Sequence, residues 1–292
     1  KILFEFQNGK KINSFLKLKK FVKKNPEDDI ARYNLGYIGQ QLKDEPLAIS
    51  CYEKVINRNK NHWQSRFNLY LILINKQKYL SALDLVNQVL DIKKNFQPAQ
   101  RDKALILNYL KKPDEALNYA RDSIKQNPQD YIAFNTLGLI LISLKNYDEA
   151  EKILLQAIKI NAKYVSSYNN LGHCYNLVNN VSKALKYFLE AEKLDPNSHE
   201  PKNNLANLYL ESGDYKKALR FYKIALEQRP SDHTILYNIA IANFNLNNDS
   251  EAEKYYKKSH SLNPSDEVLQ KNFSMLLLKK QKYSEAWELF EG

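Results

Sequence analysis

Apolar and polar positions along this chain follow the spacing of amphipathic helices, and one arrangement of them returns every 34 residues. A single alanine marks each period without any insertion: Ala48, Ala82, Ala116, Ala150, Ala184, Ala218, Ala252 and Ala286. A fixed small residue is typical of two closely crossing helices, because a larger side chain would push their axes beyond about 8 to 10 Å. The preceding segment has its own small residue, as in Leu35-Gly36 and Leu171-Gly172. The pattern therefore predicts one helical hairpin per period, made of a helix A and a helix B.

Large residues and prolines agree with this phase. A large side chain stands four residues after the alanine, on the same helix face, at Tyr52, Phe188, Tyr222, Tyr256 and Phe290. If each period is numbered from residue 29 onward, position 32 is proline at Pro26, Pro128, Pro196, Pro230 and Pro264. The other four prolines fall at the start of helix A or between the helices. Since proline costs about 3 kcal/mol inside a helix, these positions predict helix boundaries.

These features resemble the tetratricopeptide repeat family, and residues 165–198 match it best, with Tyr168, Leu171, Gly172, Tyr175, Ala184, Phe188 and Pro196. The resemblance implies an all-α fold: a right-handed superhelical solenoid of antiparallel helix pairs. It predicts a partial repeat over 1–28, with helix B of a preceding repeat near 12–25. Seven complete repeats follow at 29–62, 63–96, 97–130, 131–164, 165–198, 199–232 and 233–266, and a truncated eighth at 267–292. Tyr70 in place of glycine and Lys103 in place of leucine leave the packing of the second and third repeats less defined.

The composition excludes several classes of fold and of functional site. With 7 Gly and 9 Pro among 292 residues, the chain has too few turn formers for a many-stranded sandwich or barrel. It has no glycine-rich phosphate loop, no histidine pair at helical spacing and only Cys51 and Cys174, too far apart in a repeat array to pair. We therefore predict no catalytic residue, no metal site, no cofactor and no enzyme activity in this chain. The absence of an apolar run near the roughly 18 residues that span a bilayer, and of a disulfide framework, favours a cytoplasmic protein.

The net charge of +11 is concentrated near the start of the chain. Residues 1–28 hold eight lysines against three acids, and Lys17, Lys20 and Lys24 share one helix face. A solvated surface of helix B explains this face most simply, and binding to an acidic partner or a membrane surface is the alternative. Nucleic-acid binding is not favoured, because the tyrosines fall largely at positions expected in the core.

Position 6 of helix A, two residues before the small one, is the most informative position for function. It reads Asn34, Asn68, Asp102, Thr136, Asn170, Asn204, Asn238 and Asn272. Asparagine makes up 33 of 292 residues, so eight random positions would hold about one. A carboxamide has both donors and an acceptor, and can pair with a peptide backbone without reading side chains. The alternatives are that these asparagines cap or bridge adjacent helices, or descend from one duplicated repeat.

The asparagine series resembles that of the superhelical arm of O-linked N-acetylglucosamine transferases, in which groove asparagines hold the protein substrate. This resemblance implies a peptide-binding groove in which the six asparagines contact the backbone, with Asp102 and Thr136 interrupting the series. Positions 5 and 9 would face the same groove: Tyr33, Tyr37, Asn169, His173, Asn203, Asn207 and Tyr237.

The leading prediction is a protein-interaction scaffold that binds an extended peptide or partner protein in its concave groove. The alternative is the substrate-recruiting region of a larger glycosyltransferase, since residues 278–291 resemble the last repeat before such a domain in bacterial proteins. A plain eighth repeat with Trp287 in its core explains the same residues. Self-association through incomplete terminal repeats is a further option.

Overall fold

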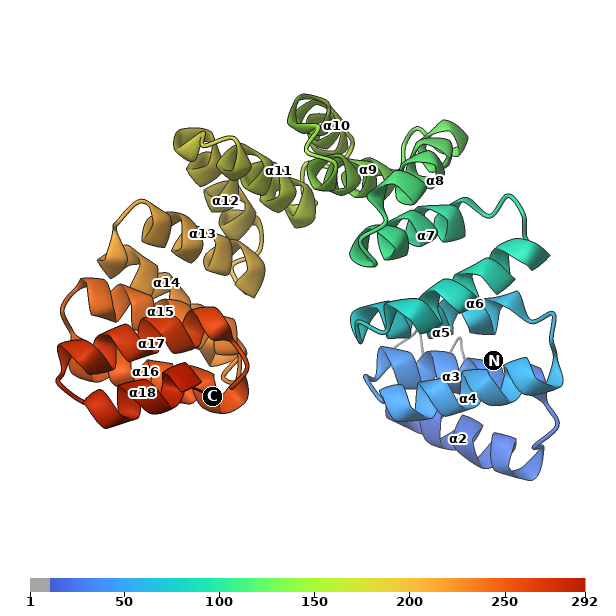
Figure 1. The fold of residues 1–292 in the computed structure, drawn as a ribbon. Helices are drawn as coiled ribbons and strands as arrows, with labels where there is room; N and C mark the ends of the chain where they lie inside the picture. The colour runs from blue at the N-terminus through green and yellow to red at the C-terminus, as the bar shows by residue number, and fades with distance from the viewer. Residues whose placement is uncertain (1–10, 292) are drawn as a thin grey trace. The chain divides into compact units, whose positions relative to one another are not determined.

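The computed structural model describes residues 11–291, and every regular element in that range is an α-helix (Figure 1). Residues 1–10 of the predicted partial repeat and Gly292 lie outside this description, and so does the side chain of Phe290. The helices are α2 (Lys11–Lys24), α3 (Asp29–Gln41), α4 (Glu45–Arg58), α5 (Trp63–Asn75), α6 (Tyr79–Ile92), α7 (Gln97–Tyr109), α8 (Pro113–Gln126), α9 (Tyr131–Ser143), α10 (Tyr147–Ile160), α11 (Val165–Leu177), α12 (Val181–Leu194), α13 (His199–Glu211), α14 (Tyr215–Gln228), α15 (His233–Asn245), α16 (Asp249–Leu262), α17 (Glu267–Lys279) and α18 (Tyr283–Glu291).

The chain divides into two compact units. Unit 1 ends at Asn146 and contains α2 to α9, whereas unit 2 begins at Tyr147 and contains α10 to α18. Within each unit consecutive helices pack against one another, as α3 does with α4 and α13 with α14. The boundary falls inside the predicted repeat 131–164, so the units do not follow the repeat division, which stays a prediction.

Helix A gives way to helix B through the same turn in each period. The residue at position 15 has a positive φ at Lys43, Gln77, Lys111, Lys145, Asn179, Gly213, Asn247 and Gln281. The next amide donates back to the carbonyl five residues earlier, as in Asp214 N to Tyr209 O at 2.9 Å. This is the Schellman pattern, in which a left-handed residue ends the helix. Seven of the eight turns adopt it without glycine.

The hairpins of residues 29–62 and 165–198 each close around a small residue on helix A and a large residue on helix B. The alanines of the 34-residue series are buried, from Ala48 at 0% exposed to Ala286 at 2%. In the helix A of residues 165–198, a Cβ added to Gly172 would lie only 2.6 Å from Phe188 Cδ1. A Cβ on Gly36 would meet Tyr52 Cε1 at 2.9 Å. The large ring of helix B therefore fills the space that the missing side chain of helix A leaves.

The second hairpin reverses this pairing. Tyr70 replaces glycine on α5, and Val86 occupies the matching place on α6; both are fully buried in one core cluster. In this hairpin the aromatic ring belongs to helix A and the smaller residue to helix B, which is the reverse of the hairpins with glycine on helix A. Ala104 and Ala120 are small on both helices of the next hairpin and are also fully buried. The second hairpin thus exchanges volume between its facing helices, whereas the third has a small residue on both.

A charge cluster fixes the end of α17 to its neighbours. The Glu253 carboxylate on α16 accepts contacts from the Nζ of Lys257 at 2.9 Å, Lys280 at 2.5 Å and Lys282 at 2.7 Å. Lys280 and Lys282 flank the turn between α17 and α18. The three ammonium groups outweigh burial and lower the pKa of Glu253 to about 2.

Replacing Gly213 by alanine tests the turn. The added Cβ would meet nothing within 4 Å, so its cost is backbone strain alone, about 1 kcal/mol of unfolding free energy. Asparagine tolerates the left-handed region better, and Gly213→Asn should cost less than Gly213→Ala. Urea unfolding followed by helical circular dichroism measures both. Equal stability of the alanine variant and the parent would contradict this account.

Glu253→Gln tests the charge cluster. A carboxylate with a lowered pKa in the folded state stabilises the fold above its unfolded pKa, and this contribution is lost as the pH falls toward 2. At pH 7 the variant should be less stable than the parent by about 2 kcal/mol. The difference should shrink between pH 5 and pH 2 when urea midpoints of both proteins are compared. A pH-independent difference would show that packing, and not charge, is lost.

Candidate functional site

Four helices A of unit 2 present equivalent stripes of side chains. Positions 2, 6, 9 and 13 are spaced by four or three residues and so lie on one helix face. On each of the four helices the residue at position 6 is half-buried and the residue at position 13 is exposed. Because position 6 lies between positions 2 and 9, the asparagine stands inside the stripe and not at its end. The unit 2 stripe consists of Ser166, Asn170, His173 and Leu177 on α11; Glu200, Asn204, Asn207 and Glu211 on α13; Thr234, Asn238, Ile241 and Asn245 on α15; and Val268, Asn272, Met275 and Lys279 on α17.

Three of the four position 6 asparagines of unit 2 bridge adjacent helices A. Asn204 Nδ2 donates to Asn169 Oδ1 on the preceding helix A at 2.8 Å. Asn238 Nδ2 donates to Asn207 Oδ1 at 3.2 Å, and that oxygen also accepts from Tyr222 Oη at 2.5 Å. Asn272 Nδ2 donates to Tyr237 Oη, again one helix A back. The bridging that the sequence offered as an alternative is thus present.

Bridging leaves part of each carboxamide available. A carboxamide has two N–H donors and one carbonyl acceptor. Among the described residues, Asn204 and Asn272 each use one N–H, Asn238 donates to Asn207 Oδ1 and also hydrogen-bonds the Tyr222 hydroxyl, and no donor contacts the Oδ1 of Asn204, Asn238 or Asn272. All three side chains therefore keep a carbonyl acceptor, and Asn204 and Asn272 also keep one N–H donor, in an orientation that the bridge holds.

Unit 1 differs at the same position. Asn68 Nδ2 donates to both Tyr33 Oη and Tyr52 Oη at 3.2 Å, which uses both of its N–H groups. Burial raises the pKa of Tyr33, so its hydroxyl stays protonated. Thr136 is only 2% exposed. Asn34 is half-buried at its place on α3. Unit 1 thus has fewer carboxamides that can pair with a peptide backbone.

Asp102 has become part of the unit 1 core. It is 5% exposed, and its carboxylate accepts from Tyr70 Oη at 3.1 Å and from Arg101 Nε at 3.0 Å. Arg101 also contacts Asp130 Oδ2 at 3.0 Å. Burial raises the pKa of Asp102, against the lowering effect of Arg101. Asp102 interrupts the asparagine series as expected, and its role is to bridge α5 and α7.

One known family of proteins matches this chain in several segments. Tetratricopeptide repeat models match residues 30–62, 109–172, 165–198 and 203–267, which together span more than half of the chain. The chain belongs to the tetratricopeptide repeat family. No curated protein sequence matches it.

Solved tetratricopeptide repeat structures share the fold. TTC0263, a thermophilic protein of Thermus thermophilus, is 24% identical with a TM-score of 0.59, over 62% of this chain and 99% of that one. A Parabacteroides merdae protein is 17% identical with a TM-score of 0.65, over 85% and 98%. PilW, described as a widely conserved type IV pilus biogenesis factor, is 20% identical with a TM-score of 0.62, over 72% and 97%. At these identities the likeness concerns the fold alone.

The remaining predicted residues of this tetratricopeptide repeat protein fall into two groups. Asn169, Asn207, Tyr33 and Tyr237 are the acceptors of the bridges, so they hold the position 6 side chains. His173 is exposed on the stripe, and Tyr37 is half-buried at the same position of α3. Asn203 Oδ1 is buried and accepts no hydrogen bond from the described residues. The sequence predicted one site from all of these positions and did not separate the residues that hold position 6 from the exposed ones.

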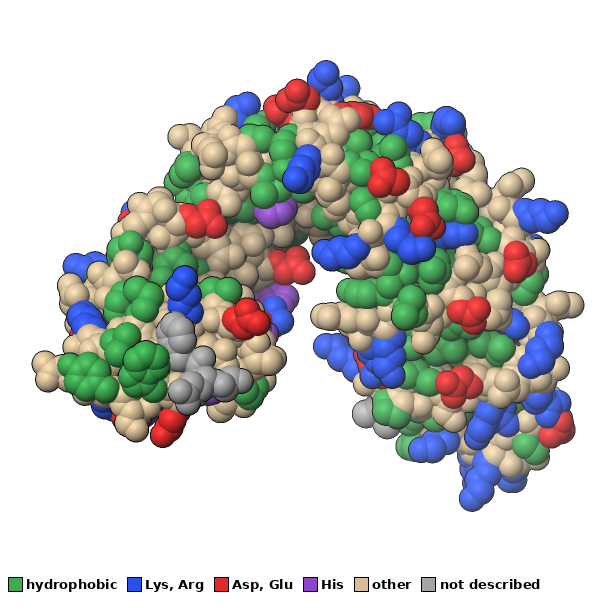
Figure 2. All heavy atoms as spheres, viewed as in Figure 1, with side chains coloured by type: hydrophobic (Ala, Val, Ile, Leu, Met, Phe, Trp, Pro, Cys, Tyr) green, Lys and Arg blue, Asp and Glu red, His purple; other side chains and the backbone are tan. Residues whose placement is uncertain are grey.

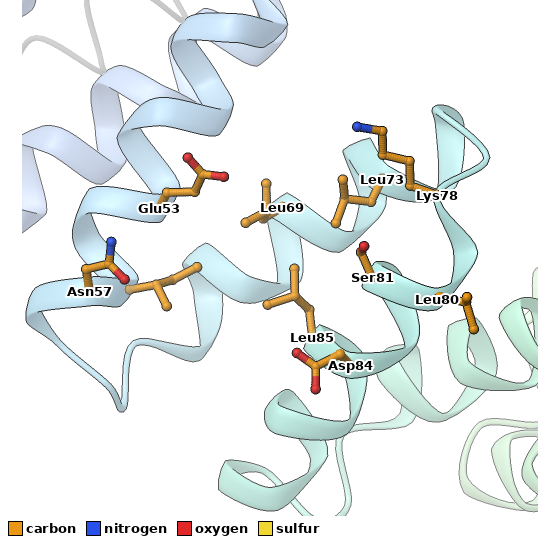
Figure 3. Close-up of a pocket in the computed structure, with 10 residues that line it drawn as sticks. Glu53, Asn57, Leu69, Leu73, Lys78, Leu80, Ser81, Asp84 and Leu85 are labelled. Carbon is orange, nitrogen blue, oxygen red and sulfur yellow. The ribbon is translucent and has the colours of Figure 1, made fainter.

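Sequence reasoning missed a hollow in unit 1 between α4, α5 and α6 (Figure 3). It has a volume of about 740 Å³, and Glu53, Leu73, Asp84 and Leu85 are among the residues that line it. At the positions of Leu73 and Leu85, the hairpin of residues 165–198 has the stacked rings of Tyr175 and Tyr187. The smaller leucines leave space there, a signal that comparing the repeats at these positions would have given.

No helix among α2 to α18 is long and apolar enough to cross a membrane. Over the same part of the chain, no three histidine, cysteine, aspartate or glutamate side chains gather as metal ligands would.

Tyr70→Phe tests whether Asp102 acts as a structural bridge. Removing the hydroxyl leaves the buried carboxylate without one donor and should lower the unfolding free energy by about 1 to 3 kcal/mol. In Asp102→Asn the charge is gone, so the same tyrosine change should cost less there. A double-mutant cycle from urea midpoints measures this coupling. Additive effects would mean that the two groups do not interact.

Proposed function

We propose that this tetratricopeptide repeat protein is an interaction scaffold, and that the stripe of unit 2 binds an extended peptide. Repeat arrays use extended surfaces built from successive repeats to bind partners. The observation that carries the proposal is the state of Asn204, Asn238 and Asn272. Each is held by the preceding helix A and keeps a carbonyl acceptor, and Asn204 and Asn272 also keep one N–H donor. Asn170 occupies the equivalent place on α11 and belongs to the proposed site.

Held side chains favour binding because their rotamers are already restricted. Ordering a flexible side chain on binding costs about 0.5 to 1.5 kcal/mol, and the bridges remove much of that cost. A carboxamide that offers a donor and an acceptor together matches the C=O and N–H of one peptide segment. Such pairing depends on the backbone, so it suits many ligand sequences.

The spacing of the helices fits an extended chain. Neighbouring helices A are in contact from α11 to α13, α15 and α17. Packed helices lie about 8 to 10 Å apart, and an extended peptide advances about 3.3 Å per residue. One asparagine would therefore meet the ligand about every three residues, which brings three or four contacts onto a segment of about ten residues.

The direct test is peptide binding by a triple variant. An array of random 12-residue peptides probed with the intact chain supplies a binding peptide, whose affinity is then measured by fluorescence anisotropy. Asn204→Ala, Asn238→Ala and Asn272→Ala together should weaken binding at least tenfold, since each net hydrogen bond contributes about 0.5 to 1.5 kcal/mol.

Two controls accompany this test. The triple variant also loses three bridges, so binding is measured below its unfolding midpoint with helical circular dichroism unchanged. The pair Asn34→Ala and Asn68→Ala changes the same residue type in unit 1 and should leave the affinity within about twofold. Unchanged affinity of the triple variant, or no saturable peptide binding by the parent, would overturn the proposal.

The repeat division predicted from the sequence and the alternative of a glycosyltransferase-recruiting region remain predictions. The second concerns sequence outside the 292 residues, and the stripe of unit 2 would serve a recruiting role in the same way.

A further inference from the structure

The unit 2 stripe is poor in cations, although the chain carries a net charge of +11. Lysine and arginine side chains are scattered over the face seen in Figure 2 and gather around α2. Among the sixteen stripe residues the only one with a permanent positive charge is Lys279. Its Nζ contacts Asp249 Oδ1 at 2.8 Å and Asn247 Oδ1 at 3.1 Å, so its charge is already paired on α16 and the turn before it. Because the chain as a whole is rich in lysine, the near absence of cations from the unit 2 stripe distinguishes this surface from the rest of the protein.

The part of the stripe on α13 carries negative charge. Glu200 and Glu211 stand at its two ends, on either side of Asn204, and both are exposed. Glu211 Oε2 accepts from Asn176 Nδ2 at 3.1 Å. No lysine or arginine of the described residues forms an ion pair with either glutamate. The α13 part of the stripe therefore presents two exposed carboxylates in a basic protein, and such carboxylates favour cationic ligand groups.

The part of the stripe on α15 and α17 is aliphatic. Val268 is 61% exposed and Met275 is 51% exposed, on either side of Asn272. Ile241 is half-buried beside Asn238. Apolar side chains exposed on both sides of a backbone-binding group are placed to cover an apolar ligand side chain.

We propose that the unit 2 stripe selects an extended peptide with a lysine or arginine over α13 and an aliphatic side chain over α17, and disfavours acidic peptides. This inference rests on the proposed function and adds the chemistry of the ligand. The asparagines hold the backbone, Glu200 and Glu211 attract the basic residue, and Val268 and Met275 cover the aliphatic one.

The helix spacing fixes the distance between the two ligand residues. From α13 to α17 there are two helix-to-helix steps of about 8 to 10 Å each. At about 3.3 Å per residue, the basic and the aliphatic side chain should stand about five or six residues apart in the peptide. A ligand family with random spacing would not match this geometry.

The peptide array that tests the proposed function also tests this inference. Among the 12-residue peptides bound by the intact chain, those with a basic and an aliphatic residue five or six apart should be enriched, and those rich in aspartate or glutamate depleted. Enrichment without the spacing, or binding with no charge preference, would overturn the inference.

Charge variants give the second measurement, on one bound peptide. Glu200→Gln with Glu211→Gln should weaken binding about 3- to 10-fold at low salt, and should flatten the salt dependence that the parent shows. Glu227→Gln, an exposed glutamate on α14, is the matched control and should change the affinity less than twofold. A peptide with the basic residue replaced by glutamine should bind the parent and the double variant equally.

Variants that remove the exposed apolar side chains of the stripe give the third measurement. Val268→Ser with Met275→Ser should weaken binding about tenfold for a peptide with leucine at the aliphatic place. The loss should be much smaller when that leucine is alanine. If the asparagine variant abolishes binding while both the charge and the apolar variants bind as the parent does, the ligand chemistry is wrong and the peptide-binding function stands. If the asparagine variant binds normally, the function itself fails.

Discussion

The close crossing of helix A and helix B at one small residue is the constraint on which the rest of this structure depends. The alanine of each period is buried almost completely because the facing helix leaves no room for a longer side chain. A large residue one turn away, such as Phe188 against Gly172, then fills the remaining volume. In unit 2 each helix A from α13 to α17 then lies against the one before it, near enough for side chains at position 6 to hydrogen-bond backward.

That backward hydrogen bond changes how the asparagine series is understood. The sequence presented peptide binding and helix bridging as alternatives, and the structure shows bridging at Asn204, Asn238 and Asn272. The two roles are compatible because a carboxamide has more hydrogen-bonding groups than one bridge uses. Asp102 shows the other outcome: its carboxylate is buried between Tyr70 and Arg101 and serves the fold.

The fold could be predicted in detail because its signals are local and repeated. Alanine at every 34th residue and proline at fixed positions predicted helix boundaries that recur as α3 to α18, and α2 lies within one residue of the predicted segment 12–25. Other features depend on pairs of positions. The exchange of bulk between Tyr70 and Val86 becomes visible only when facing positions are compared. The left-handed turns at Lys111 and Gln77 could not be predicted from residue type, since neither side chain favours positive φ. The hydrogen bonds of the stripe depend on the distance between helices, which periodicity alone does not give.

A division of roles along helix A follows from these contacts. Position 6 stabilises the array, so changing it to alter the ligand would also weaken the packing of adjacent repeats. Positions 2 and 13, and position 9 except at Asn207, carry little of the packing, so ligand chemistry can vary there at low cost to stability. The chain agrees with this in its own repeats: position 9 is Tyr37, Leu71, Leu105 and Leu139 in unit 1, and His173, Asn207, Ile241 and Met275 in unit 2. An array built this way can retain a common way of holding the peptide backbone while each unit acquires its own preference for side chains.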